Sequence, residues 1–198
     1  IWQPVLRVPH GGIFVLRHDT VLKKAEAAAG NGSPVLEMNG TSWIIGNGAL
    51  IENLDDEGQT IHLDRSSAGC GRHGGGPMRR RIFTGIENLH IRQHAANSAA
   101  LLAMGLADGQ RVLFDALLLE RQAGSVVNEA MAVCHGSPDS VDPGLLQFRR
   151  CETIREGAKG LVQVIKSTAG THRHVLMVDD CKTSAIAWGN TAGDGQSG

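Results

Sequence analysis

The four residues Ile86-Glu87-Asn88-Leu89 open a pattern that recurs further along the chain. Each copy has an apolar residue, a polar residue, a variable residue and a second apolar residue. The later copies are Phe114-Asp115-Ala116-Leu117, Phe148-Arg149-Arg150-Cys151 and Val178-Asp179-Asp180-Cys181. Their first residues are 28 (114 − 86), 34 (148 − 114) and 30 (178 − 148) residues apart. A period that drifts in this way is typical of a solenoid whose strands stay in register while insertions extend from the turns.

This repeat predicts an all-β protein, a right-handed parallel β-helix formed by residues 1–198 as one domain. In such a helix each strand lies on the equivalent strand of the previous coil at a spacing of about 4.8 Å, so like residues stack on like. The apolar residues then point inward and the polar residues between them point outward. Sharp corners need residues that tolerate positive φ, and both Asn88 and Gly46-Asn47-Gly48 are suited to them. The composition agrees, because Gly supplies 26 of 198 residues.

Short runs of Val, Ile and Leu between turn residues extend along the chain, as expected for an all-β protein. Residues 97–104 are an exception, since an N-cap-like Asn precedes good helix formers, and a short helix in a turn is an alternative there. Ala25–Ala29 are a candidate for one more helical turn. The different alternative of an α/β enzyme depends on that helix and on the glycine motif of residues 69–74. This motif formally fits a dinucleotide loop, but Gly75-Gly76-Pro77 follows it where a helix is needed.

The net charge of −1 argues against a general affinity for nucleic acid or anionic membranes. No stretch approaches the roughly 18 continuous apolar residues of a membrane span. Aromatic residues make up 4% of the chain and Tyr is absent, which counts against a sugar-binding protein. The chain begins at Ile1 without a leader and ends in the polar residues 191–198. Because the open edges of a β-helix must be capped or paired, we expect either further coils of a longer chain or a homo-oligomer.

Three stretches resemble the pectate-lyase-like β-helix superfamily. Residues 43–51 look like its opening coil, I-x-G-x-G-x-x-I, and residues 85–91 resemble its I-x-N-L-x-I coil, with Asn88 at the asparagine corner. Residues 9–16 are similar to its lead-in strand, P-x-G-x-Y-x-L, with Phe14 in place of Tyr. The resemblance implies a parallel β-helix and a protein that is secreted or lies on an extracellular or virion surface. The superfamily includes lyases, hydrolases, epimerases, phage tail spikes and adhesins, so the motifs do not define one chemistry.

Asp179-Asp180-Cys181 resembles the D-D-C element of polygalacturonase-type glycoside hydrolases. In that family neighbouring carboxylates protonate the leaving group and activate water, which requires two acids at a controlled separation. The G-H-G and R-I-K elements expected downstream and the N-T-D element expected upstream are absent from this sequence. The alternative is a solvated corner that carries two acids.

Stacking of the repeats predicts a second cluster of charges. Glu87, Asp115 and Asp179 are expected in one outward row, with Arg149 among them. In a lyase such acids, often with bound calcium, neutralise a uronate carboxylate while Arg or Lys abstracts the α-proton. The alternative is that exposed strand positions simply carry charges, with alternating sign limiting repulsion.

Cys151 and Cys181 occupy equivalent positions in successive repeats and are expected to stack in the core. Stacked strands bring their Cα atoms near the lower end of the disulfide range, but in-register side chains point the same way, so we expect two reduced thiols. Cys70 with His73, and Cys134 with His135, offer two metal ligands each. A structural zinc site needs four, so no metal site is expected from these pairs.

Two functional hypotheses follow, and a polysaccharide is the expected partner in both. The first is an enzyme, glycoside hydrolase or polysaccharide lyase, that works on the solvent face of the helix. The second is a non-catalytic β-helix of a phage tail spike, an adhesin or a surface scaffold, which scarce aromatic residues and incomplete motifs favour. No cofactor is expected, apart from calcium if the protein is a lyase. Glu120 and Arg121 belong to the same charged region, and the candidate catalytic residues are Asp179, Asp180, Asp115, Glu120 and Arg149.

Overall fold

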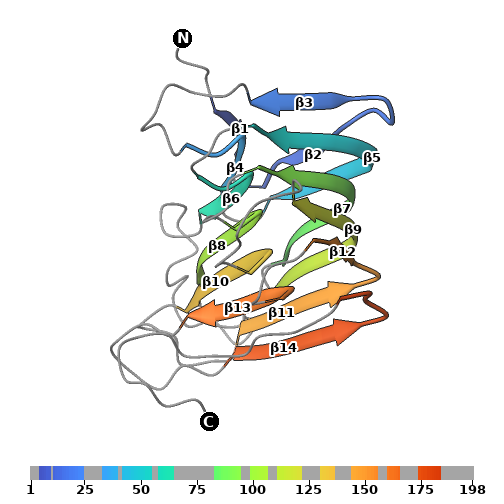
Figure 1. The fold of residues 1–198 in the computed structure, drawn as a ribbon. Helices are drawn as coiled ribbons and strands as arrows, with labels where there is room; N and C mark the ends of the chain where they lie inside the picture. Colours follow the sequence, from blue (N-terminus) through green and yellow to red (C-terminus); the bar gives the residue numbers. More distant parts are fainter. Residues whose placement is uncertain are drawn as a thin grey trace.

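The computed structural model describes residues 5–9, 11–24, 33–39, 42–54, 58–64, 83–94, 99–106, 111–121, 130–136, 144–155, 160–165 and 174–183. Within these ranges the regular structure is β-strand, without a helix. The strands form two parallel sheets, and within each sheet the strands of successive turns lie side by side (Figure 1). The protein is therefore an all-β parallel solenoid, as the repeat predicts.

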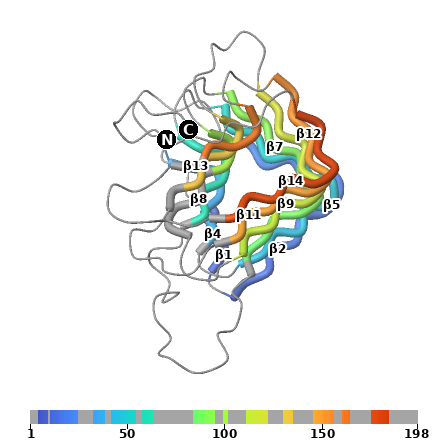
Figure 2. The backbone as a smooth tube through the Cα atoms, turned by 90° about the horizontal axis from the view of Figure 1, so that it is seen from below, coloured from blue at the N-terminus to red at the C-terminus, as the bar shows by residue number. Residues whose placement is uncertain are grey.

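The chain passes back and forth between the two sheets. The six-stranded sheet contains, in order across it, β1 (Leu6–Val8), β4 (Leu36–Asn39), β6 (Ile61–Asp64), β8 (Leu101–Leu106), β10 (Ala132–Gly136) and β13 (Val162–Ile165). The eight-stranded sheet contains β14 (His174–Asp179), β11 (Gly144–Arg149), β9 (Arg111–Arg121), β7 (Phe83–Gln93), β5 (Trp43–Asn53) and β2 (Ile13–Val15). Beside this path, β12 (Glu152–Ile154) pairs with β9, and β3 (Val21–Lys24) pairs with β5. The consecutive strands β2 and β3, like β11 and β12, therefore belong to the same sheet. Seen along the stack, strands of each sheet lie one behind another (Figure 2).

The register confirms the alignment of the four repeats. Ile86 pairs with Phe114, Phe114 with Phe148, and Phe148 with Val178. The row also extends backward to Ile44 and Phe14, which do not belong to the four repeats seen in the sequence. Because the strands keep this register although the repeats differ in length, the extra residues lie in the connections.

The inward rows form one apolar core. Ile44, Ile86 and Phe148 are fully buried, and the rings of Phe114 and Phe148 pack with their centroids 4.9 Å apart. Stacked aromatic rings in this geometry add attraction beyond the area that they bury. The core therefore consists of continuous ladders that run through neighbouring turns.

A corner divides the eight-stranded sheet into two faces. In successive turns the corner residue has positive φ; these residues are Asn47 (51°), Asn88 (52°), Ala116 (52°), Arg150 (53°) and Asp180 (49°). Asn and Asp adopt this conformation more readily than other L-residues, and both predicted corners are confirmed. The Nδ2 atom of Asn47 also donates a hydrogen bond to the carbonyl of Leu16 in the preceding turn, at 2.8 Å. We call the part before the corner the first face, with β2, β11 and β14, and the part after it the second face, with β3 and β12.

The large exposed apolar side chains of the described residues lie on the outermost strands. Leu6, Ile13, Val15 and Val21 belong to β1, β2 and β3, and Val175 and Met177 belong to β14. These strands have a hydrogen-bonded neighbour on one side only in the described part of the chain. The expectations of further coils or of a homo-oligomer stay predictions.

The alternative of a short helix at residues 97–104 is wrong where the structure describes it, because Leu101–Leu106 form strand β8. The backbone bonds of this segment go to its neighbours: the Ile61 amide donates to the Ala100 carbonyl at 3.0 Å, and the Leu101 amide donates to the Met131 carbonyl at 3.0 Å. Helix propensity differs among ordinary residues by only about 0.7 kcal/mol per residue, so burial and pairing on both sides outweigh it. The helical turn considered for Ala25–Ala29 and the glycine motif at 69–74 lie outside the described residues.

Ala116 provides a test of the corner. The left-handed conformation costs a residue with a Cβ atom roughly 1–2 kcal/mol. Glycine avoids this cost but loses more backbone entropy on folding, which offsets part of the gain. We expect Ala116→Gly to raise the free energy of unfolding by about 0.5–1 kcal/mol in urea titrations. The control is Ala49→Gly, which removes a buried methyl group where φ is not positive and should destabilise the protein. A loss of stability for Ala116→Gly would contradict the account of the corner.

Candidate functional site

Three of the five candidate catalytic residues lie in one outward row of the first face. Asp115 in β9 pairs in register with Arg149 in β11, and Arg149 pairs with Asp179 in β14. Asp180 follows at the corner, with φ 49°. Glu120 lies beyond the corner of its own strand, on the second face, so it does not belong to this row.

Asp115 is an outward residue that is nevertheless only 3% exposed, because two arginines of the next turn cover it. Arg150 donates from Nε to Oδ1 at 2.9 Å and from its NH2 group to Oδ2 at 2.6 Å. The NH2 group of Arg149 also donates to Oδ2. These bonds, from Arg149 first and then Arg150, lower the pKa of Asp115 from 3.8 to about 2. Asp115 is thus an ionised acceptor that joins two turns.

Arg149 is poorly suited to accept a proton from a substrate. Its hydrogen bond to Asp115 raises the pKa of the guanidinium above its ordinary value, so the group holds its proton more tightly. A base in a lyase must have an unprotonated form near the working pH. The contacts therefore favour a structural role for Arg149 over abstraction of an α-proton.

Asp179 and Asp180 differ from Asp115 because both are exposed and neither has a side-chain ion pair with another described residue. The carbonyl of Asp179 does take part in the stack, since it accepts a hydrogen bond from the Arg150 amide at 2.9 Å. Of the candidate acids, these two have the carboxylates most accessible to a ligand.

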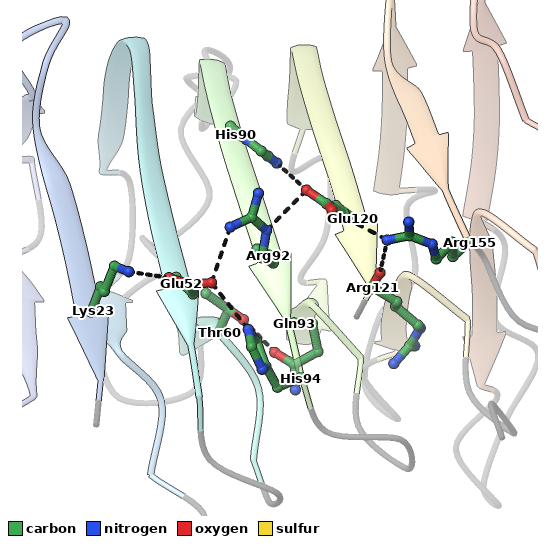
Figure 3. A network of polar contacts seen from close by, with 10 residues as sticks. All are labelled: Lys23, Glu52, Thr60, His90, Arg92, Gln93, His94, Glu120, Arg121 and Arg155. Atoms are coloured by element: carbon green, nitrogen blue, oxygen red, sulfur yellow. Dashed lines mark hydrogen bonds and ion pairs between the residues drawn. The ribbon is translucent and has the colours of Figure 1, made fainter. Parts of the chain in front are cut away.

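Glu120 belongs to a row of alternating charge on the second face, formed by Lys23, Glu52, Arg92 and Glu120 (Figure 3). Glu120 accepts from Arg92 Nε at 3.0 Å and lies 2.8 Å from the Nε2 atom of His90. Burial alone would raise the pKa of Glu120, but these two partners outweigh it and the pKa is lowered. From the following turn Arg155 lies 3.5 Å away, at the other oxygen.

Glu52 is the centre of the other half of this row. Lys23 Nζ lies 2.9 Å from one of its oxygens, and Arg92 and the Nε2 atom of His94 each lie 3.1 Å from the other. Burial would raise the pKa of Glu52, but hydrogen bonds from Lys23, His94 and Arg92 lower it to about 2. Strands β3, β5, β7 and β9 are thus joined by ion pairs that the sequence alone did not indicate.

A buried polar row lies at the end of the second face, where the chain turns back to the other sheet. It consists of Lys24, Asn53, Gln93 and Arg121, all pointing inward in register. Their side chains donate to carbonyls of the returning chain, among them Lys24 to Ser33 at 2.5 Å, Gln93 to Gly58 at 2.8 Å and Arg121 to Ala130 at 3.1 Å. Buried backbone groups need such partners. Arg121 is therefore an internal residue. The sequence predicts it with Glu120 in one charged surface region, to which it does not belong.

No group of three or more His, Cys, Asp or Glu side chains is arranged to hold a metal ion in the described part of the chain. Over the same residues, no helix has the length and apolar character needed to cross a membrane. The calcium expected for a lyase stays a prediction. His135 lies on β10, next to buried Cys134, whereas Cys70 and His73 fall outside the described ranges.

Comparisons of the chain with protein-family models, with curated proteins and with solved structures found no match. The parallel β-solenoid is established by the strand pairing itself. Membership of the pectate-lyase-like superfamily stays a prediction from the short motifs.

Replacing Asp115 tests whether its pairing is structural. We expect Asp115→Asn to lower the free energy of unfolding at neutral pH by about 1–2 kcal/mol, because two guanidinium groups lose their ionised acceptor. The matched control is Glu87→Gln, in the same row but without a described ion pair, which should change stability by less than about 0.5 kcal/mol. Equal effects of the two substitutions in urea unfolding would contradict this assignment.

The acid dependence of stability tests Glu52. Its folded pKa is lowered, so its contribution is present above the ordinary value of 4.5 and is lost as the pH falls toward about 2. We expect the free energy of unfolding to fall over this range, and Glu52→Gln to make the fall shallower. Glu37→Gln, which removes the partner of the exposed Arg7, should leave the slope unchanged. Identical slopes for the wild type and Glu52→Gln would rule out the proposed linkage.

Proposed function

We propose that this chain is a non-catalytic β-solenoid that binds a polysaccharide along its first face, in an extracellular or virion-surface setting. The observation that carries the proposal is the pairing of the candidate catalytic groups. Asp115, Glu120 and Arg149 are all engaged with oppositely charged side chains of neighbouring turns. Their charges form ion pairs that hold neighbouring turns together.

Glycosidase chemistry needs a carboxylic acid whose pKa is raised, so that it can give a proton to the leaving group. The pKa of Asp115 is lowered to about 2 and that of Glu120 is also lowered. Both groups are therefore carboxylates at any physiological pH. This state suits acceptors of hydrogen bonds and does not suit general acids.

The first face offers a regular surface for an extended polymer. Its strands are about 4.8 Å apart, which is comparable to the length of one sugar unit, so consecutive sugars can meet equivalent positions. The outward row beside Asp115 is largely apolar and contains Ile13, Trp43, Gly85, Leu113, Gln147 and Met177. A polysaccharide has apolar C–H sides and hydroxyl groups, which can contact the apolar row and the charged row beside it, respectively.

Trp43 is the best candidate for a stacking contact with a sugar ring. Its indole lies over the backbone of Gly85, where an added Cβ atom would come within 2.5 Å of the ring. The glycine thus allows the indole to lie close against the sheet, and the ring is only partly buried. An aromatic surface packs against the C–H side of a sugar. The side chains of Arg149 and Arg150 are exposed, and their terminal N–H groups that do not bind Asp115 can donate to hydroxyl or carboxylate oxygens.

The test is calorimetric titration with a panel of neutral and uronate-containing polysaccharides. We expect one class to bind without being cleaved, and Trp43→Ala to weaken binding about tenfold, while Trp43→Phe retains most of the affinity. The Phe variant separates loss of the aromatic face from loss of packing on Gly85. Absence of binding to every glycan, or equal affinity for the wild type and Trp43→Ala, would overturn the proposal.

A second candidate function is hydrolysis at Asp179 and Asp180, favoured by the exposure of these two carboxylates. A reducing-end assay on the same panel decides between the two functions. Release of reducing ends that disappears in both Asp179→Asn and Asp180→Asn would establish the hydrolase and replace the binding proposal. Formation of unsaturated uronates, seen by ultraviolet absorbance, would instead indicate a lyase.

A further inference from the structure

Cys151 and Cys181 lie directly opposite each other in neighbouring turns. Arg149 pairs in register with Asp179, and Glu152 pairs with Lys182, so the two cysteines between them are equivalent. Both are free thiols. The stacking expected from the sequence is therefore confirmed.

The Cys181 side chain reaches the backbone of Cys151, although in-register side chains usually run parallel. The Cys151 amide lies 3.4 Å from the sulfur of Cys181, within hydrogen-bonding distance. The Cys181 sulfur also lies 3.3 Å from the carbonyl of Asp179, and the Cys151 sulfur lies 3.4 Å from the carbonyl of Arg149. The Cys181 sulfur thus lies against the backbone of Cys151. The expected Cα separation of about 4.8 Å falls within the range that a disulfide spans, roughly 4.4–6.8 Å.

The two thiols differ in accessibility. Cys151 is 2% exposed, whereas Cys181 is partly exposed in the outermost turn that the structure describes. Burial raises the pKa of the Cys151 thiol to about 12, and the neighbouring Cys181 contributes to the rise. Oxidation starts at the thiol that solvent reaches, so Cys181 reacts first and Cys151 is held next to it.

We propose that Cys151 and Cys181 form a redox modification site that a peroxide converts into a disulfide. The Cys181 thiolate attacks the peroxide, a sulfenic acid forms on its sulfur, and hydroxide or an alkoxide leaves. The Cys151 sulfur then attacks this sulfenic sulfur, its thiol proton goes to the departing hydroxyl, and water is released with formation of the disulfide. Overall two thiols lose two electrons and two protons, and the peroxide is reduced.

This bond would tie the last described turn to the turn before it. The chain from Cys151 to Cys181 includes β12, β13 and β14, so the disulfide closes a whole turn. It would hold the corner that carries Asp179 and Asp180 against the stack. Because the two side chains leave their strands in the same direction, we expect a strained bond that mild thiol reductants open readily.

The test is treatment of the folded, full-length chain with hydrogen peroxide, followed by peptide mapping without reduction. We expect a peptide pair joined through Cys151 and Cys181, which disappears on reduction. In Cys151→Ser the sulfenic acid should persist on Cys181 and react with dimedone. In Cys134→Ser, the matched control, the disulfide should still form, because the register partners of Cys134 are Ala103 and Val164 and neither is a cysteine.

Hydrogen exchange supplies a second readout that does not require a variant. Oxidation should slow exchange of the amides of β14 and leave those of β5 unchanged. The proposal is overturned if peroxide leaves both thiols unmodified, if Cys181 proceeds to a sulfinic acid with Cys151 unmodified, or if Cys181 joins a second chain. None of these outcomes bears on polysaccharide binding through Trp43, so the two proposals fail independently.

Discussion

Each strand of the central turns hydrogen-bonds to the strand one turn before it and to the strand one turn after it, and these bonds place equivalent residues directly above one another. Every other feature depends on this constraint. Apolar residues become ladders, of which the row through Ile86 and Phe114 is the clearest. Residues that tolerate positive φ become a continuous corner, and charged residues meet charges from neighbouring turns. Repetition along the axis therefore replaces the varied contacts of a globular core.

The charges divide into two systems on either side of the corner. On the first face one carboxylate, Asp115, joins two arginines of the next turn, and on the second face Glu52 and Glu120 alternate with Lys23 and Arg92. Exposed ion pairs contribute little, but these carboxylates are largely covered by their partners and form networks. The same arrangement explains why acids that look catalytic in the sequence have a lowered pKa in the folded protein.

The rows that the sequence predicts lie before the corner, where the four repeats align with one another without a gap. The anchors Ile86, Phe114, Phe148 and Val178 and the corner at Asn88 belong to this part. Beyond the corner the spacing changes: Ile44 and Ile86 are 42 residues apart (86 − 44), but Ile51 and Ile91 are only 40 apart (91 − 51), because the turn at Gly46-Asn47-Gly48 contains two more residues than its neighbour. An alignment continued through this corner without a gap therefore fails to pair Lys23 with Glu52, and Glu52 with Arg92. Arg92 and Glu120 keep the spacing of Ile86 and Phe114, but the pair alone does not show the longer row. The buried row with Lys24 and Arg121 was missed for another reason, since charged residues ordinarily lie outside the core and only the returning chain explains them.

The strands lie across the axis of the stack, and their hydrogen bonds run along it. A force that pulls the two ends of the stack apart therefore acts in series on all the interfaces between turns. Strands β5, β7 and β9 have 11 residues each, whereas β2 and β3 at one end have three and four and β14 at the other has six. The shortest interfaces yield at the lowest force, so the solenoid would peel from its outer turns while its middle stays wound.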